Sequence, residues 1–355
     1  MTSTQGPSDP TSPAKREGDP ASSTPTITTR MILALALPSL GALIAEPLFT
    51  VIDSTMVGHL GTPQLAGLGI ASTVLNTAVG LFIFLAYSTT SLAGRHLGAG
   101  RRDCAIRSGV EAMWLAGGLG ALAAILLAVF ASPLLTWLGA DAATMPHALA
   151  YLRASAPGLV GMFVVLAATG TLRGLQDTRT PLVAASVGAA FNAVANWVLM
   201  YPLNLGVAGS GLGTAITQTL MAAFLGWMIV RAAQREGVSL RPSTYGLFGA
   251  ALEGAPLLVR TLALRVALLA TLSAVTAIST QALAAHQIVW TLWTFAAYVL
   301  DALAIAAQAL AGFTTGTGER GAMRPLLRTL SRWGIGFGVA VGVALAITAP
   351  WITRI

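Results

Sequence analysis

Carboxylates inside long apolar segments are the residues of this sequence best suited to chemistry. Glu46 and Asp53 lie seven residues apart in AEPLFTVIDSTMVGHLG, so on a helix they are about two turns apart on roughly one face. A charged group within a bilayer is costly unless it faces a cavity or a partner. We therefore expect Asp53, with Glu46 as a possible second carboxylate, to take up and release a coupling cation. The alternative is that Asp53 caps a helix end near the outer interface.

Further polar residues interrupt later apolar segments. Asn192 and Asn196 have the i, i+4 spacing that places them on one helix face. They are expected either to line a polar cavity or to hydrogen-bond between helices. Asp301, in YVLDALAIAAQ, forms a possible second polar site with Arg260 and Gln308. The alternative for Asp301 is an ion pair with Arg260 or Arg265.

The composition identifies the solvent around these residues. Hydrophobic residues make up 55% of the 355 positions and charged residues only 9%, with a mean hydropathy of +0.75. Soluble domains carry about 25% charged residues. The apolar runs are continuous over twenty residues or more, whereas barrel strands would alternate in polarity. The sequence predicts an all-α polytopic membrane protein embedded in the lipid bilayer.

Nine apolar segments are long enough to cross a bilayer. They follow a Ser-, Thr- and Pro-rich stretch, residues 1–30, which is expected to be a disordered cytoplasmic tail. The nine predicted spans are 31–57, 64–93, 109–136, 146–171, 180–201, 207–232, 249–279, 282–313 and 328–351.

The positions of the arginines predict the orientation. They cluster in the tail and in alternate loops, while the intervening loops GHLGT, LGADAATMPHA, PLNLG and STQ carry none. Short loops rich in Lys and Arg stay in the cytoplasm. We expect a multi-pass protein of the cell membrane with its N-terminus in the cytoplasm.

An internal repeat divides the chain. At an offset of 218 residues, positions 65–102 align with 283–320 without a gap, and Gly98/Gly316, Gly100/Gly318 and Arg102/Arg320 are the informative identities. Six predicted spans separate the copies, so both have the same orientation, as in a parallel repeat. We expect a six-helix N-terminal lobe at 31–235, a cytoplasmic linker at 236–248 and a partial, three-helix second lobe at 249–355.

Several classes of function are excluded or disfavoured by missing residue types. The net charge of +7 comes from short arginine clusters between apolar runs, which does not favour nucleic-acid binding. The only lysine is Lys15, so no nucleotide-binding P-loop exists, and the single Cys104 and four scattered histidines offer no metal-ligand set. We expect no enzyme activity, no cofactor and no resident metal.

Motifs along most of the chain resemble those of one transporter family. They are PLFTVIDSTMVGHLGTPQLAGLGIA at 47–71, AGRHLGAGRR, RGLQDTRTP at 173–181, LGVAGSGLGTAITQ at 205–218, ALAAHQI and LDALAIAAQALAG. With these motifs the chain resembles the multidrug and toxic compound extrusion (MATE) family, in its DinF-like branch.

The resemblance implies a fold and a function. The fold would be two six-helix lobes that rock around a central cleft, and the function would be export of small organic, often cationic, compounds in exchange for H⁺ or Na⁺. The family's coupling aspartate matches Asp53, and its polar neighbours match Asn192 and Thr214. Asn196 stands where a second Asp is frequent, so we expect coupling to H⁺ through Asp53, with Glu46 as a possible helper.

The resemblance also raises a question of length. The family has three more helices than this chain, so we expect a fragment, a C-terminally truncated gene product, or a shortened form that needs a partner. Unless another chain completes the second lobe, we expect no vectorial transport. Two alternatives stay open: a flippase for lipid-linked precursors in the same superfamily, and a truncated membrane protein without transport activity. A flippase would need a basic lumen, and the predicted spans of the first lobe hold no central arginine. The substrate and the oligomeric state are not specified by the sequence.

Overall fold

The computed structural model describes the backbone of residues 29–352, and every regular element in that range is an α-helix. The predicted tail therefore lies outside the described residues except for its last two positions. The helices are α1 (Thr29–Gly58), α2 (Thr62–Leu81), α3 (Phe84–Gly98), α4 (Arg102–Trp137), α5 (Met145–Ser155), α6 (Gly158–Gly174), α7 (Arg179–Met200), α8 (Val207–Arg235), α9 (Thr244–Ile278), α10 (Thr280–Thr317) and α11 (Arg320–Ile352).

The prediction of an all-α multi-pass membrane fold is confirmed. Among the described residues, seven helices are long and apolar enough to cross a membrane, or eight if one bent pair counts as a single span. They match the first eight predicted segments. The ninth, 328–351, is helical within α11, but it is not among these candidates.

Two of the predicted spans are each built from two helices. The chain from α2 to α3 is interrupted at Phe82–Ile83, and α5 meets α6 at a bend of 52° around Ala156–Pro157. Proline has no backbone N–H to continue the helical hydrogen bonds, which accounts for the second break. Ile83, at the first break, lines the cavity that is described below as the candidate site.

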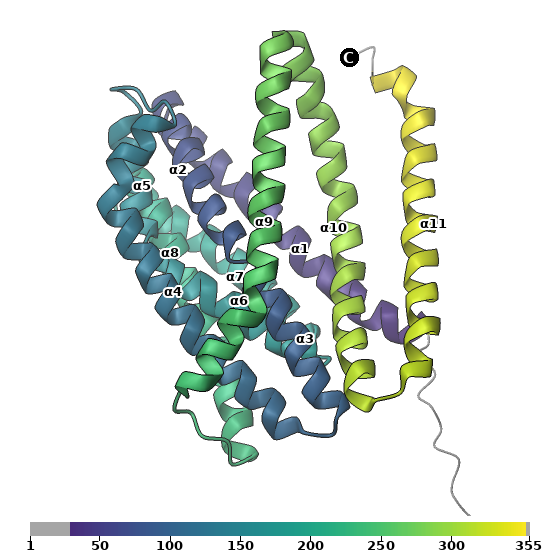
Figure 1. Cartoon of the computed structure of the whole chain (residues 1–355). Helices are drawn as coiled ribbons and strands as arrows, with labels where there is room; N and C mark the ends of the chain where they lie inside the picture. The colour runs from purple at the N-terminus through teal and green to yellow at the C-terminus, as the bar shows by residue number, and fades with distance from the viewer. Residues whose placement is uncertain (1–28, 353–355) are drawn as a thin grey trace, which may run out of the picture.

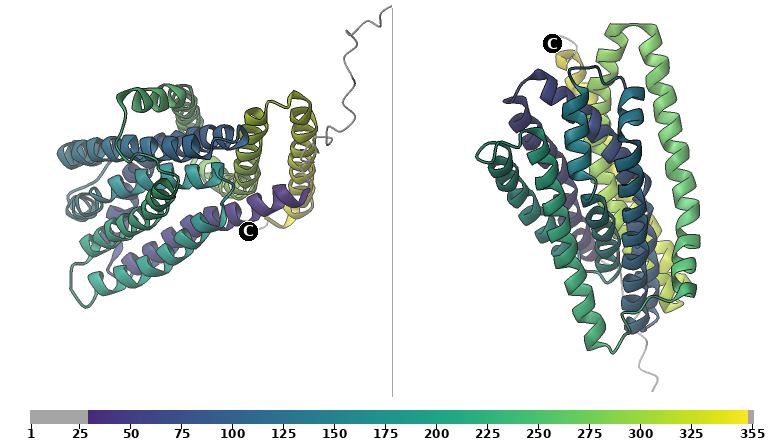
Figure 2. Two further views of the ribbon diagram at one scale, coloured as in Figure 1. Left: turned by 90° about the horizontal axis from the view of Figure 1, so that it is seen from below. Right: turned by 90° about the vertical axis from the view of Figure 1, so that its left-hand side faces the viewer.

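The last three helices stand beside the bundle formed by α1 to α8. In Figure 1, α9, α10 and α11 run side by side along one flank, and α1 passes obliquely behind them. A second view along the bundle, in Figure 2, shows α10 and α11 next to the beginning of α1. There Ile32 and Leu35 form a buried apolar cluster with Leu310 of α10 and Leu326 of α11.

Reciprocal glycine contacts join the two copies of the internal repeat. A Cβ placed on Gly94 of α3 would meet the backbone of Ala309, Gly312 and Phe313, and one on Gly312 of α10 would meet Ser91 O at 2.8 Å and the backbone of Gly94 and Arg95. The next pair repeats this pattern: Gly98 faces the Phe313 carbonyl and Gly316 faces the Arg95 carbonyl. Gly94 and Gly98 correspond to Gly312 and Gly316 at the 218-residue offset. Such exchange of contacts between equivalent positions is the pattern produced by a twofold axis between α3 and α10.

The turns that follow these helices are also equivalent. Gly100 after α3 has φ +73° and Gly318 after α10 has φ +75°. Few residues other than glycine adopt this left-handed conformation without strain. The repeat predicted from sequence therefore extends to backbone geometry at the helix ends.

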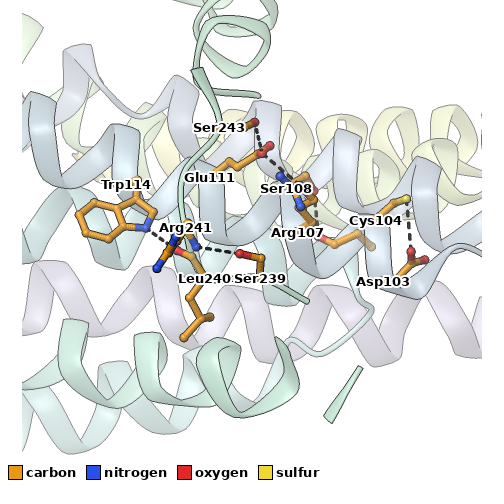
Figure 3. Close-up of polar contacts among 11 residues, drawn as sticks. Asp103, Cys104, Arg107, Ser108, Glu111, Trp114, Ser239, Leu240, Arg241 and Ser243 are labelled. Atoms are coloured by element: carbon orange, nitrogen blue, oxygen red, sulfur yellow. Dashed lines mark hydrogen bonds and ion pairs between the residues drawn. The ribbon is translucent and has the colours of Figure 1, made fainter. Parts of the chain in front are cut away.

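The connection between the two parts of the chain is held against α4, as Figure 3 shows. Glu111 accepts a hydrogen bond from Ser243 Oγ at 2.7 Å and pairs with Arg107 at 3.3 Å. Trp114 Nε1 donates to the carbonyl of Leu240 at 3.0 Å. These contacts fix the segment that leaves α8 before α9 begins at Thr244, inside the predicted linker 236–248.

Candidate functional site

The candidate site is a cavity of about 340 Å³ lined by residues of α1, α2, α3, α5, α6, α7, α8 and α10. Most of its lining is apolar. Few ionisable side chains reach it among the described residues: the carboxylates of Asp53 and Asp301, the guanidinium of Arg173, and the hydroxyls of Tyr87, Tyr151 and Tyr298. Its volume lies at the lower end of the range of small-molecule sites.

Asp53 is held inside the bundle by side chains of two other helices. It is only 4% exposed. Its Oδ1 accepts a hydrogen bond of 2.9 Å from Asn196 Nδ2 on α7 and one of 2.6 Å from Ser210 Oγ on α8. Since α1 continues to Gly58 and the partners are on other helices, Asp53 does not act as a helix cap. Both of these hydrogen bonds end at Oδ1, and neither uses Oδ2. Asp53 also lines the cavity.

The two asparagines stand behind this carboxylate. Asn196 also donates to Asn192 Oδ1 at 2.8 Å, and both asparagines are buried without lining the cavity. Of their two predicted arrangements, hydrogen bonding between helices is the one that the structure shows for Asn196. Three buried polar atoms around Asp53 have no hydrogen-bond partner among the described residues: Asn192 Nδ2, Asn196 Oδ1 and Thr214 Oγ1.

Glycines let α8 approach close enough to build this network. A Cβ on Gly209 would meet the backbone of Leu199 at 2.7 Å, and one on Gly211 would meet the Tyr151 carbonyl at 2.6 Å. A Cβ on Gly213 would overlap Asn196 Oδ1. The segment GVAGSGLGTAITQ is thus small on the faces toward α5 and α7, and polar at Ser210 and Thr214 toward Asp53.

Replacing Gly213 with Val should therefore disrupt the asparagine network. We expect the added side chain to displace Asn196 from Asp53, with a loss of roughly 1 to 3 kcal/mol of stability. The readout is the thermal unfolding midpoint of the purified chain in detergent. The matched control is Gly226→Val on the same helix, where the nearest atom to a new Cβ is Met113 Sδ at 3.9 Å. Equal midpoints for the two variants would contradict the packing argument.

Two site residues were missed by the sequence reasoning. Ser210 lies four residues before Thr214 on α8, so the i, i+4 rule that selected the asparagines points to it as well. Tyr151, 4% exposed on α5, lines the cavity beside Thr214 and Ser72 and interacts electrostatically with Asp53. No local signal in the sequence indicates that α5 reaches this site.

Of the other predicted residues, Asp301, Arg260 and Gln308 are not among the hydrogen-bond partners of Asp53. The side chain of Glu46 lies outside the described residues. Asp301 reaches the cavity from α10 and interacts electrostatically with Arg260, but it forms no ion pair within 4 Å with Arg260 or Arg265, as the alternative required. Gln308 is half-buried, and its Oε1 has no partner among the described atoms.

Arg173 corrects one expectation. From sequence, the predicted span 146–171 ends before Arg173, which leaves this residue in a cytoplasmic loop, and the predicted spans of the first lobe hold no central arginine. In the structure α6 continues to Gly174, so Arg173 lies within its last turn, is 8% exposed and lines the cavity. Arg173 reaches the cavity because α6 extends to Gly174, although its charge alone would favour a cytoplasmic loop.

Comparisons with known proteins agree with this architecture. The sequence matches the family described as MatE over residues 38–198 and 256–355. It is 32% identical over 331 residues to Protein DETOXIFICATION 44, chloroplastic, of Arabidopsis thaliana, an alignment that covers 89% of the chain and 63% of that protein. It is 30% identical to DNA damage-inducible protein F of Escherichia coli K12, covering 84% of the chain and 66% of that protein.

The fold has solved counterparts. A crystal structure of MATE in the bent conformation superposes with a TM-score of 0.84 over 91% of this chain and 73% of the other, at 22% identity. The chain spans less than two thirds of the length of the two curated relatives.

Proposed function

The chain belongs to the MATE family of multi-pass membrane transporters, and we propose that it serves as a cation-coupled antiporter that exports small organic compounds, with Asp53 as the coupling carboxylate. The observation that carries this proposal is the buried Asp53, held by side chains of α7 and α8 at the wall of a cavity of small-molecule size. We place the protein in the cell membrane, with its N-terminus in the cytoplasm.

Each group in the network has a role in this proposal. Asn196 and Ser210 donate hydrogen bonds to Oδ1 and so stabilise the ionised carboxylate. Oδ2 stays available to a proton that arrives through the cavity. Asn192 holds the amide of Asn196 in the orientation that donates to Asp53. Uptake of a proton removes the charge that these donors stabilise, and so changes the contacts between α1, α7 and α8.

We favour H⁺ over Na⁺ as the coupling ion. The two groups nearest to Asp53 Oδ1 present hydrogens to it, whereas a metal ion needs oxygen ligands. The unpartnered oxygens of Asn196 and Thr214 are the groups that a sodium ion would use instead. An experiment with and without sodium distinguishes H⁺ from Na⁺ as the coupling ion.

The test is proton release caused by a substrate. Purified full-length chain in weakly buffered detergent should release protons into solution when a cationic dye such as ethidium is added, because dye and proton compete for one binding-competent state. A pH indicator dye in the solution reports the release, which should persist when choline replaces sodium. In liposomes containing the protein, the same addition should dissipate a preset pH gradient. A release that requires sodium would assign the site to Na⁺, and no release at any pH would refute proton coupling.

A further inference from the structure

Arg173 is the buried charge that the coupling network does not use. It lies one residue before the end of α6, and more than nine tenths of its surface is covered. It nevertheless lines the same cavity as Asp53. Asn196 and Ser210, which hold Asp53, lie on α7 and α8, whereas Arg173 lies on α6.

The guanidinium makes no hydrogen bond and no ion pair with any described residue. Its Nε is buried without a hydrogen bond, and no described carboxylate lies within 4 Å of the side chain. A buried charge without a counter-ion is strongly destabilising, so such a group is retained at a cost in stability. Arg173 thus offers a planar set of donors to the cavity that no described side chain occupies.

Tyr87 is the neighbour of Arg173 that also interacts with charged residues of two further helices. Tyr87 of α3 also lines the cavity and interacts electrostatically with Arg173, with Asp301 of α10 and with Arg260 of α9. Asp301 is itself exposed and also lines the cavity. The arrangement gives the cavity wall a guanidinium and a phenol hydroxyl, both of which can donate to an oxyanion.

We propose that Arg173 and Tyr87 form a subsite that binds the carboxylate of a small organic substrate, an organic anion or a zwitterion. This rests on the proposed transport function, since it assigns a substrate class to the same cavity. A guanidinium binds a carboxylate with two parallel hydrogen bonds, which gives both energy and orientation. The apolar lining and the volume of about 340 Å³ suit the hydrocarbon part of a small molecule better than a bare inorganic ion.

The first test compares two probes of nearly the same size and shape, one an anion and the other neutral. Isothermal titration of the purified full-length chain should show that 2-naphthoate binds more tightly than 2-naphthamide by roughly 10- to 100-fold, the value of hydrogen bonds to a charged group. Arg173→Gln should remove this preference and Arg173→Lys should keep part of it. The matched control is Arg179→Gln, at an exposed arginine six residues further on, and it should bind as the unmodified chain does.

A second measurement separates binding from a structural role. If Arg173 is kept for a substrate, Arg173→Met should raise or leave unchanged the thermal midpoint of the ligand-free protein, because it removes an unpaired buried charge. 2-Naphthoate should then stabilise the unmodified chain and not this variant. A lower midpoint for Arg173→Met, together with equal binding of the two probes, would show that Arg173 serves packing and would overturn the proposal.

Two further outcomes separate this inference from the proposed function. Asp53→Asn should retain the preference for naphthoate while losing proton release, so the subsite stands even if coupling through Asp53 fails. Conversely, proton release with no preference between the probes would sink only the carboxylate subsite. Displacement of both probes alike by inorganic phosphate or chloride would assign Arg173 to simple anions and would also overturn it.

Discussion

The substitution Asp53→Asn should reduce substrate-induced proton release to the level of protein-free samples. The amide is nearly the same size as the carboxyl group, but it does not exchange a proton in the accessible pH range. Its oxygen can still accept a hydrogen bond from Ser210, so the loss of stability should stay near or below about 1.5 kcal/mol. The measurements are proton release in detergent and dissipation of a pH gradient in liposomes, with the thermal midpoint recorded beside them.

The matched control for this substitution is Asp103→Asn. Asp103 is an exposed carboxylate in the first turn of α4, outside the cavity, so the same chemical change there should leave proton release intact. Ser210→Ala tests the network in a milder way, since it removes one donor to Asp53 and keeps the carboxyl group. Undiminished exchange by Asp53→Asn would remove the coupling role from this residue, whatever the other variants do.

The location of Asp53 could be inferred from the sequence because the bilayer makes a buried carboxylate conspicuous. Asn192 and Asn196 followed from helical spacing, and Thr214 from the resemblance to the MATE family. The structure brings all four to one place, but it puts the asparagines behind the carboxylate and not in the cavity wall. Helical spacing identifies a shared face and leaves open what that face contacts.

Arg173 and Tyr151 show what local sequence patterns leave undetermined. The charge rule assigns arginines near a helix end to the cytoplasm, and one more helical turn was enough to carry Arg173 into the cavity. Tyr151 reaches the site because Gly211 lets α8 lie against the α5 backbone. Both positions depend on how separate helices pack, which no single segment encodes.

For the internal repeat, the sequence predicts which residues are equivalent, and the structure shows which of them are in contact. The 218-residue offset identified Gly98 with Gly316 and Gly100 with Gly318 as equivalent residues. It gave no indication that the two copies touch each other at these glycines. The structure shows that they do, so the small residues kept in both copies are explained by one interface between α3 and α10.

This interface leads to the second large expected effect. Gly98→Val should separate α3 from α10, because a Cβ there would overlap the Phe313 carbonyl, and backbone cannot move aside as a side chain can. We expect a loss of roughly 3 kcal/mol, read as a lower thermal midpoint in detergent. Gly118→Val, at a helical glycine of α4 with nothing within 4 Å, is the matched control and should have little effect.

The twofold relation between α3 and α10 also predicts the stability of the equivalent variant and of the double variant. Gly316→Val should lower the midpoint by a similar amount, since its Cβ would overlap the Arg95 carbonyl in the equivalent position. The double variant should cost clearly less than the two single losses added together, because either substitution alone already opens the shared contact. Fully additive losses would mean that the two glycines belong to independent contacts. The reciprocal packing across a twofold axis would then not describe how these helices are held together.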